Sequence, residues 1–215
     1  DHINDSNNKI DQVLYTQPIK FAFEYSIAKL LIELGIKPNY MIGHSFGEIG
    51  AACLSGVFKL EDALEVVALR AELMDSVEAG LMMSVNMTEK QVNEYISKHK
   101  DISLAAINGT ELCIVSGTIK GIEEFEQIVN KDGYDTLMLK VPRAGHSNMM
   151  IPIMEKFRER ISQMKLSKPS IPYISGLSGD WVTNEEATSD KYWSRHLKES
   201  IIFSDGLTKL LKKGD

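Results

Sequence analysis

Hydrophobic residues recur at helical spacing along residues 18–34. The apolar positions of this stretch are Ile19, Ala22, Phe23, Ile27, Leu30, Leu31 and Leu34. Positions three and four apart share one face of a helix, so the pattern predicts a strongly amphipathic helix. Pro18 suits the first helical position, where no backbone N–H is needed, and Gly35 marks the end of the helix.

Strand and helix patterns alternate through much of the remaining chain. The predicted elements are a strand at residues 40–42, a helix at 48–54 that ends near Gly56, a helix at 61–77, a helix at 148–164, a strand at 173–175 and an amphipathic helix at 203–212. Strands that alternate with helices favour a parallel sheet with helices packed against it.

The segment between the predicted helices at 61–77 and 148–164 has a different order of strands and helices. It predicts a strand at 81–87, a helix at 89–99, strands at 102–107 and 112–116, a helix at 119–130 and a strand at 134–141. This β-α-β-β-α-β order is typical of ferredoxin-like folds. Asn108 and Gly109 form a favourable turn pair between the two middle strands.

We therefore predict an α/β fold with an insertion. Residues 1–79 and 143–215 are expected to form a hydrolase-like parallel sheet flanked by helices, and residues 80–142 a small ferredoxin-like subdomain. No strand pattern precedes the first helix and none follows Gly214, so the larger part is expected to be truncated at both ends.

Composition narrows the possible classes of protein. The net charge of −6 and the absence of a basic stripe argue against nucleic-acid binding. Two cysteines, Cys53 and Cys113, lie in apolar runs and are expected to be buried thiols, which favours a cytoplasmic protein. No membrane-spanning run or signal peptide is recognised, and residues 1–11 are expected to form a polar linker or loop.

The sequence Gly43-His44-Ser45-Phe46-Gly47 matches the G-x-S-x-G nucleophile elbow. It stands between the predicted strand at 40–42 and the helix at 48–54, which is the strand-turn-helix context that this motif requires. Glycines flank the serine because a Cβ atom at either position is expected to clash. The motif therefore predicts that Ser45 is a nucleophile.

A serine hydroxyl needs a base, most often a histidine. His2 and His99 lie in polar surroundings, and His44 is expected to be a packed or hydrogen-bonded core residue because strand neighbours point to opposite faces. His146 follows the predicted insertion, where cleft residues are common, and is preferred to His196 as the base. No aspartate stands out as the third member of a triad.

Arg70 lies late in the predicted helix at 61–77 and has two interpretations. It can be a surface residue that caps the helix C-terminus, or a buried guanidinium near Ser45 that binds a carboxylate in a bidentate manner.

Several separated motifs together resemble the acyltransferase domain of modular polyketide synthases and the related malonyl-CoA:acyl carrier protein transacylases. The resemblance covers essentially the whole chain. Its segments are Tyr15-Thr16-Gln17-Pro18, Gly43-His44-Ser45-Phe46-Gly47-Glu48, Arg70 with Leu73-Met74, Ala105-Ala106-Ile107-Asn108-Gly109, Val115-Ser116-Gly117, His146-Ser147 with Met150, and Trp193 to Phe203.

The resemblance implies a ping-pong transfer through an ester on Ser45, with His146 as general base and acid. It implies that a backbone carbonyl near His196 orients His146, that the Phe46 N–H forms half of the oxyanion hole, and that Arg70 binds the free carboxylate of a malonyl-type substrate. A second oxyanion donor belongs to a Gly-Gln-Gly-Ser-Gln segment that this sequence does not contain. His44, Asn108 and His196 are expected to lie around the site.

The same resemblance implies an acyl-CoA thioester as substrate and an acyl carrier protein with its phosphopantetheine thiol as partner, next to synthase domains such as a ketosynthase. No bound cofactor and no metal are expected. Selectivity is expected from Phe46 and from Arg143, Ala144 and Gly145, the residues before the histidine. Arg143-Ala144-Gly145-His146 matches neither the His-Ala-Phe-His pattern of malonyl enzymes nor the Tyr-Ala-Ser-His pattern of methylmalonyl enzymes.

Malonyl is the first choice of extender because Phe46 favours it. Methylmalonyl or ethylmalonyl is the second, because Gly145 leaves room for a larger substituent. Two alternatives from other classes remain at this point, namely an acyl hydrolase that uses the same Ser45 and His146, and an inactive docking or scaffold domain.

Overall fold

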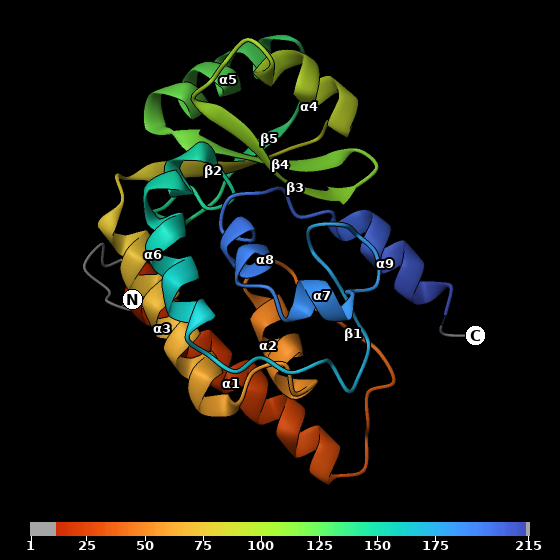
Figure 1. Ribbon diagram of the computed structural model, residues 1–215. Coiled ribbons are helices and arrows are strands. Elements are labelled where there is room, and N and C mark those ends of the chain that lie inside the picture. The colour runs from red at the N-terminus through yellow and green to blue at the C-terminus, as the bar shows by residue number, and fades with distance from the viewer. Residues whose placement is uncertain (1–11, 214–215) are drawn as a thin grey trace, which may run out of the picture.

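The computed structural model describes residues 12–213. The predicted polar stretch at residues 1–11, with His2, and the end of the chain at Gly214 lie outside the described residues. The described chain forms a helical lower part and a smaller upper part that contains a four-stranded sheet (Figure 1).

The smaller part follows the predicted β-α-β-β-α-β order. Its elements are β2 (Gly80–Val85), α4 (Glu89–Ile96), β3 (Ile102–Gly109), β4 (Leu112–Thr118), α5 (Ile119–Lys131) and β5 (Thr136–Met138). The strand order is β3-β4-β2-β5, and all three neighbouring pairs are antiparallel. Helices α4 and α5 cover the outer face of this sheet (Figure 1), and its inner face lies toward the rest of the molecule.

The larger part surrounds two short parallel strands, β1 (Met41–Ile42) and β6 (Tyr173–Ile174). Its helices are α1 (Val13–Glu33), α2 (Gly47–Leu54), α3 (Leu60–Ser76), η2 (Asn148–Met150), α6 (Ile151–Ser162), α7 (Asn184–Ala187), α8 (Asp190–Arg195) and α9 (Phe203–Leu211). The parallel pairing agrees with the predicted α/β class. The two short helices α7 and α8 contain too few residues to produce a clear periodic pattern.

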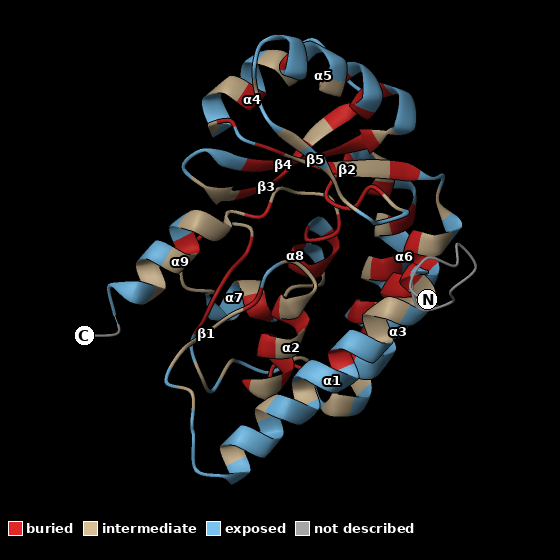
Figure 2. Cartoon of the chain, turned by 180° about the vertical axis from the view of Figure 1, so that it is seen from behind, coloured by how far each residue is buried: buried red, intermediate tan, exposed pale blue. Residues whose placement is uncertain are grey.

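Buried hydrophobic residues form separate clusters in the two parts (Figure 2). One cluster centres on Phe58 and Trp193, whose rings meet edge to face at 4.9 Å. Another joins the sheet to α4 and α5 through residues such as Val92 and Phe125. Cys53 and Cys113 are free and buried, as predicted, and burial raises the pKa of each thiol to about 11.

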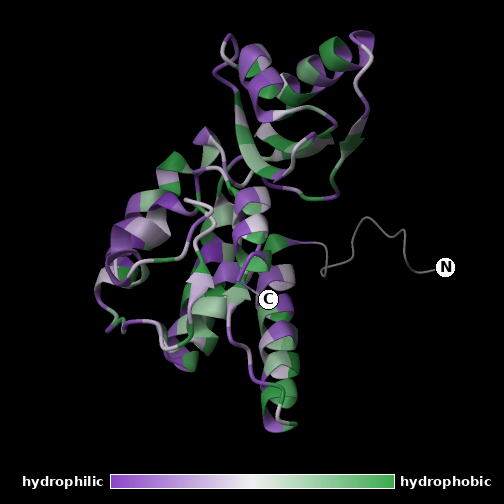
Figure 3. Ribbon diagram, turned by 90° about the vertical axis from the view of Figure 1, so that its right-hand side faces the viewer, coloured by the Kyte–Doolittle hydropathy of each residue, from purple (hydrophilic) through white to green (hydrophobic). Residues whose placement is uncertain are grey.

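The first helix departs from its prediction in two ways. It begins at Val13, and Pro18 lies inside it. The carbonyl of Gln12 accepts hydrogen bonds from the Tyr15 and Thr16 N–H groups, which starts the helix before the proline. The apolar positions that made this helix amphipathic in the sequence are largely exposed: Phe23 keeps 65% of its surface and Leu34 keeps 70%. Helix α1 accordingly shows hydrophobic, green stretches toward its lower end (Figure 3).

The predicted turn at Asn108 and Gly109 was also wrong by two residues. Both residues belong to the end of β3, with Gly109 paired to Leu112, and the turn consists of Thr110 and Glu111. The side chain of Asn108 accepts a hydrogen bond from His44, which keeps this residue in the strand and aimed at the larger part.

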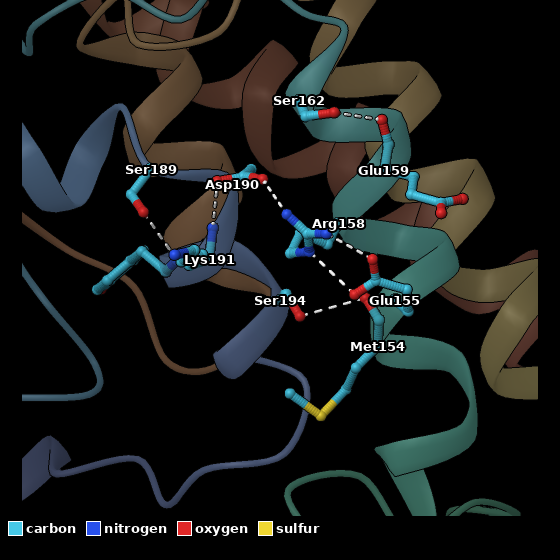
Figure 4. A network of polar contacts seen from close by, with 10 residues as sticks. Met154, Glu155, Arg158, Glu159, Ser162, Ser189, Asp190, Lys191 and Ser194 are labelled. Atoms are coloured by element: carbon cyan, nitrogen blue, oxygen red, sulfur yellow. Dashed lines mark hydrogen bonds and ion pairs between the residues drawn. The ribbon is translucent and has the colours of Figure 1, made fainter.

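Polar contacts fix α6 against α8 at the edge of the larger part (Figure 4). Arg158 of α6 donates to Asp190 at 3.0 Å, and the Ser194 hydroxyl donates to the Met154 carbonyl at 3.2 Å. Helix α8 leads into the segment that contacts His146. None of the helices described between residues 12 and 213 is long and apolar enough to cross a membrane.

Candidate active site

The nucleophile elbow joins β1 to α2. Ser45 has φ = 52°, a left-handed backbone conformation that is uncommon for a residue other than glycine. A Cβ atom at Gly43 would lie 2.3 Å from the Glu48 nitrogen, so only glycine fits there. Nothing lies within 4 Å of a Cβ atom at Gly47, so the predicted clash at this second glycine was wrong. The elbow depends on Gly43.

His146 lies directly against Ser45, although 101 positions separate them in the sequence. The Ser45 Oγ and the His146 Nε2 are 2.5 Å apart. The His146 Nδ1 is 2.9 Å from the backbone carbonyl oxygen of Glu199. A carbonyl oxygen only accepts, so Nδ1 carries the proton and Nε2 is free to accept from the serine hydroxyl.

The backbone also holds His146 in place. Its N–H donates to the Leu197 carbonyl at 2.9 Å, and its φ is 57°. The neighbouring Ser147 hydroxyl donates back to the Ala144 carbonyl at 2.6 Å, which closes the turn around the histidine. The segment before α6 and the segment after α8 therefore jointly position one imidazole.

Burial holds the pKa of His146 well below its ordinary value of 6.5. Electrostatic repulsion from His196 and Arg70 lowers this pKa further, whereas the hydrogen bond to Glu199 raises it. Desolvation is the largest of these effects because the imidazole is almost completely enclosed. A neutral imidazole at neutral pH is the form that can accept a proton from Ser45.

Arg70 is buried on α3 with 3% of its surface exposed, which excludes a surface capping residue. Its Nη1 donates to the Gln17 side-chain oxygen at 2.6 Å, while its Nε has no hydrogen-bond partner among the described residues. Burial lowers the pKa of Arg70 to about 10, so the guanidinium remains charged at neutral pH. A buried charge without a counter-ion is costly, which makes this group receptive to an anion.

A cavity of about 600 Å³ connects these groups. Ser45, His146 and Arg70 all line it. The inner face of the small sheet forms another wall, through Met82, Ala106 and Ile114. The site therefore lies between the two parts of the molecule, as the position of His146 after the insertion suggested.

The structure brings most of the other predicted residues to this cavity. Phe46, Asn108, Arg143 and Gly145 line it, whereas Ala144 is buried and is not among the lining residues. No acceptor takes the Phe46 backbone N–H among the described residues, which leaves it free at the start of α2. No cluster of metal-binding side chains occurs within residues 12–213.

His44 differs from its prediction as a core residue. It is exposed, its Nε2 lies 2.7 Å from the Asn108 side-chain oxygen, and its ring packs against Phe203 at 4.9 Å. His196 is buried with its ring centre 5.9 Å from that of His146. It hydrogen-bonds Glu48 and makes no contact with Ser45 through hydrogen bonds.

Sequence reasoning did not assign a role to Glu48, which follows the elbow. This carboxylate is fully buried. It accepts from the Gly176 N–H at 2.7 Å, from His196 at 3.0 Å and from the Tyr192 hydroxyl. Its position directly after Gly47 was the available signal in the sequence. The signal is weak, because an acidic residue in the first turn is common at any helix and does not reveal buried partners.

The chain matches the family model described as an acyl transferase domain over residues 2–215. It is 34% identical over 201 residues to polyketide synthase GfsB of Streptomyces halstedii, an alignment that covers 92% of this chain and 4% of the synthase.

Solved structures agree with this match. The acyl transferase domain of ZmaA is 42% identical, with a TM-score of 0.88 and coverage of 95% of this chain and 47% of that one. The acyl transferase domain of SpnD, in complex with 2-(pent-4-yn-1-yl)malonyl, is 32% identical, with a TM-score of 0.90 and coverage of 97% and 50%. The chain thus spans about half the length of these domains.

Proposed function

The chain belongs to the acyl transferase domain family, which includes acyltransferase domains of modular polyketide synthases, and on this premise we propose that it transfers a malonyl-type acyl group from a CoA thioester to an acyl carrier protein. The acyl group is held as an ester on Ser45 between the two half-reactions. The observation that carries the proposal is the 2.5 Å contact between the Ser45 Oγ and the unprotonated Nε2 of His146.

In the first half-reaction, the His146 Nε2 takes the hydroxyl proton while the Ser45 oxygen attacks the thioester carbonyl. The C–O bond forms, and the carbonyl oxygen becomes an oxyanion that the free Phe46 N–H can stabilise. Collapse of this intermediate breaks the C–S bond, and His146 returns the proton to the CoA sulfur. The products are an acyl ester on Ser45 and free CoA.

In the second half-reaction, the thiol of a carrier-bound phosphopantetheine loses its proton to His146 and attacks the ester. The C–S bond forms, the C–O bond to Ser45 breaks, and the proton returns to the serine oxygen. Because the Glu199 carbonyl keeps Nδ1 protonated throughout, the same Nε2 atom serves as base and as acid in both steps.

Arg70 supports the choice of a carboxylated acyl group. Its charge lies in the cavity with Ser45, has no carboxylate partner among the described residues, and retains an unpaired Nε donor. The carboxylate of a malonyl group can supply both the missing charge and the missing acceptor. A plain acyl group such as acetyl leaves the guanidinium uncompensated, so it gains none of this binding energy.

The cavity also favours certain substituents on the central carbon of the malonyl-type group. Phe46 lines the cavity beside the nucleophile and favours malonyl, so malonyl is the first candidate. Gly145 contributes no side chain to the wall, and the SpnD domain is complexed with a malonyl group that carries a pentynyl substituent. Methylmalonyl or ethylmalonyl is therefore the second candidate. The CoA substrate and the buried free thiols fit a cytoplasmic enzyme that works beside other synthase domains.

Labelled malonyl-CoA tests the proposal. The protein is incubated with it, digested, and the label is located by mass spectrometry, with Ser45→Ala as the control. Label on Ser45 that moves to an added acyl carrier protein supports transfer. Rapid release of free malonate without transfer supports the hydrolase, and absence of label from malonyl-, methylmalonyl- and ethylmalonyl-CoA contradicts the proposal in favour of a docking domain.

A further inference from the structure

The side chain of Arg143 holds the end of α3. Its Nε donates to the Met74 carbonyl at 3.1 Å, and its Nη2 donates to the Asp75 carbonyl at 2.8 Å and to the Asp75 carboxylate at 3.0 Å. Its Nη1 donates to the Pro142 carbonyl at 3.0 Å. The side chain keeps 19% of its surface exposed, so most of the guanidinium is enclosed by these partners.

The end of α3 needs such a donor. The helix stops at Ser76, and Val77 is extended, so its last carbonyls have no helical N–H partner. Its last turn contains no basic residue of its own and includes the acidic Asp75. A cation at this position interacts favourably with the helix dipole and with that carboxylate. Arg143 supplies it from a segment 68 positions away.

The contact between Arg143 and the end of α3 also holds the segment before His146 close to that helix. A Cβ atom at Gly145 would lie 3.3 Å from the methyl carbon of Met74, so the segment and the helix are already close. Met74 is one turn beyond Arg70 on α3, and the two share a face of that helix. Gln17 bridges them, since it accepts from Arg70 and donates to the Met74 sulfur at 3.4 Å.

We propose that Arg143 is a positioning residue that fixes the segment carrying Gly145 and His146 against α3 and thereby limits the size of the acyl group beside Ser45. This inference rests on the proposed acyl transfer. In a malonyl ester on Ser45, the carbon between the two carbonyl groups lies between Ser45 and Arg70. A substituent on that carbon meets the wall that Gly145 and Met74 form, and loosening the contact lets this wall retreat.

The test compares Arg143→Ala and Arg143→Lys with two other variants. Asp75→Ala removes the ion pair and leaves the bonds from Arg143 to the Met74, Asp75 and Pro142 carbonyls. Arg160→Gln is the matched control, because Arg160 pairs with Glu65 of the same helix α3 but does not line the cavity. The lysine variant keeps the charge, but its single ammonium group does not reproduce the planar fork that spans two carbonyls.

Amide hydrogen exchange of residues 144–147 is the first readout. Hydrogen bonds from a charged donor are among the stronger ones, so Arg143→Ala is expected to raise exchange in this segment about tenfold or more. Arg143→Lys is expected to give an intermediate increase. Asp75→Ala and Arg160→Gln are expected to stay within about twofold of the starting protein, since neither breaks a backbone contact of the segment.

Size discrimination at Ser45 is the second readout and needs no natural substrate. Methanesulfonyl fluoride and the bulkier phenylmethanesulfonyl fluoride each form a sulfonate ester on the serine oxygen and release fluoride, while His146 takes the proton. Arg143→Ala is expected to raise the rate ratio of the bulky to the small reagent about threefold, a change of less than 1 kcal/mol in relative barrier. The ratio of methylmalonyl to malonyl loading is expected to move in the same direction.

Unchanged exchange or an unchanged sulfonylation ratio in Arg143→Ala overturns the inference, and so does an equal change in Arg160→Gln. If Arg143→Ala does not fold, Arg143→Lys decides by the same two readouts. Failure of the proposed function is a separate result. In that case Ser45 of the unmodified protein accepts no malonyl-type group, while the sulfonylation ratio still reports on the wall that Arg143 holds.

Discussion

The His146 Nδ1 lies 2.9 Å from the backbone carbonyl oxygen of Glu199. This contact fills the place that a carboxylate occupies in a Ser-His-Asp triad. A carbonyl fixes the tautomer and the ring orientation, but it brings no full negative charge to stabilise an imidazolium. The histidine is therefore held in its neutral form, and the buried Arg70 and the neighbouring His196 disfavour its protonation further.

We predict that activity persists to lower pH than an ordinary histidine allows. His146 acts as a base when neutral, and its pKa lies well below 6.5, so kcat/KM is expected to stay level as the pH falls from 8 to 6.5 and to decline only below that. The measurement is the pH dependence of Ser45 acylation at limiting substrate. A midpoint at or above pH 6.5 contradicts this assignment.

Arg70→Ala is expected to change the preference between acyl groups. Two hydrogen bonds from a charged group are worth about 3 kcal/mol, so discrimination in favour of malonyl-CoA over acetyl-CoA should fall about a hundredfold. Competition between the two labelled thioesters measures the ratio. Gln17→Ala is the control, because it removes a neighbour of the guanidinium and leaves the charge in place. An unaltered ratio in Arg70→Ala contradicts the proposal that Arg70 binds the free carboxylate of the substrate.

The elements of the small sheet were largely predictable because their alternating apolar residues lie between clear turn and helix signals. The exposed face of α1 was not, because residues such as Phe21 and Phe23 are equally apolar and only packing decides which of them is buried. The preference of proline for the first helical position placed Pro18 at the start of the predicted helix. The structure starts it earlier because the Gln12 carbonyl finds donors that no periodicity reveals.

The residues of the candidate site show the same contrast between what the sequence reveals and what only packing decides. Ser45, His146 and Arg70 carry distinctive side chains within recognisable motifs, so the sequence located all three before their distances were known. The Glu199 carbonyl and the carbonyls bound by Arg143 belong to the backbone, which every residue possesses. Partners of that kind depend on where helices end and loops cross, so only the family resemblance placed one of them near His196, and no side chain marks the carbonyls themselves. The sequence accordingly marks Arg143 only as a selectivity residue, and its contacts with the end of α3 appear only in the folded structure.

Gly43→Ala and Gly47→Ala form a matched pair on either side of Ser45. At Gly43 the added carbon meets backbone atoms at 2.3 Å that cannot rotate away, so we expect a loss of about 3 kcal/mol in the free energy of unfolding. At Gly47 the space is open and the residue is helical, so alanine should leave stability unchanged or raise it by up to about 1 kcal/mol. Urea denaturation measures both. Equal losses of stability in the two variants contradict the conclusion that the elbow requires glycine only at position 43.

Glu48→Gln should destabilise the fold under the elbow. All three partners of this buried carboxylate donate to it, so an amide there replaces a charged acceptor by a neutral one and forces the Tyr192 hydroxyl to reverse from donor to acceptor. The expected loss is about 2–4 kcal/mol in the free energy of unfolding. Tyr192→Phe serves as the milder comparison, because it removes one hydroxyl and leaves the carboxylate its other two donors. Thermal denaturation of both variants gives the ranking, and a Tyr192→Phe loss greater than that of Glu48→Gln counts against it.

Ser45 and His146 both have a left-handed backbone, at φ values of 52° and 57°. Each such residue costs of order 1–3 kcal/mol, which the surrounding contacts must offset. Replacement of Ser45 by glycine should therefore yield an inactive protein that is harder to unfold, whereas glycine at position 146 also removes a buried, hydrogen-bonded imidazole. Mutational drift toward greater stability would favour the loss of this strained serine, so a nucleophile at position 45 is a feature that selection for activity has to maintain.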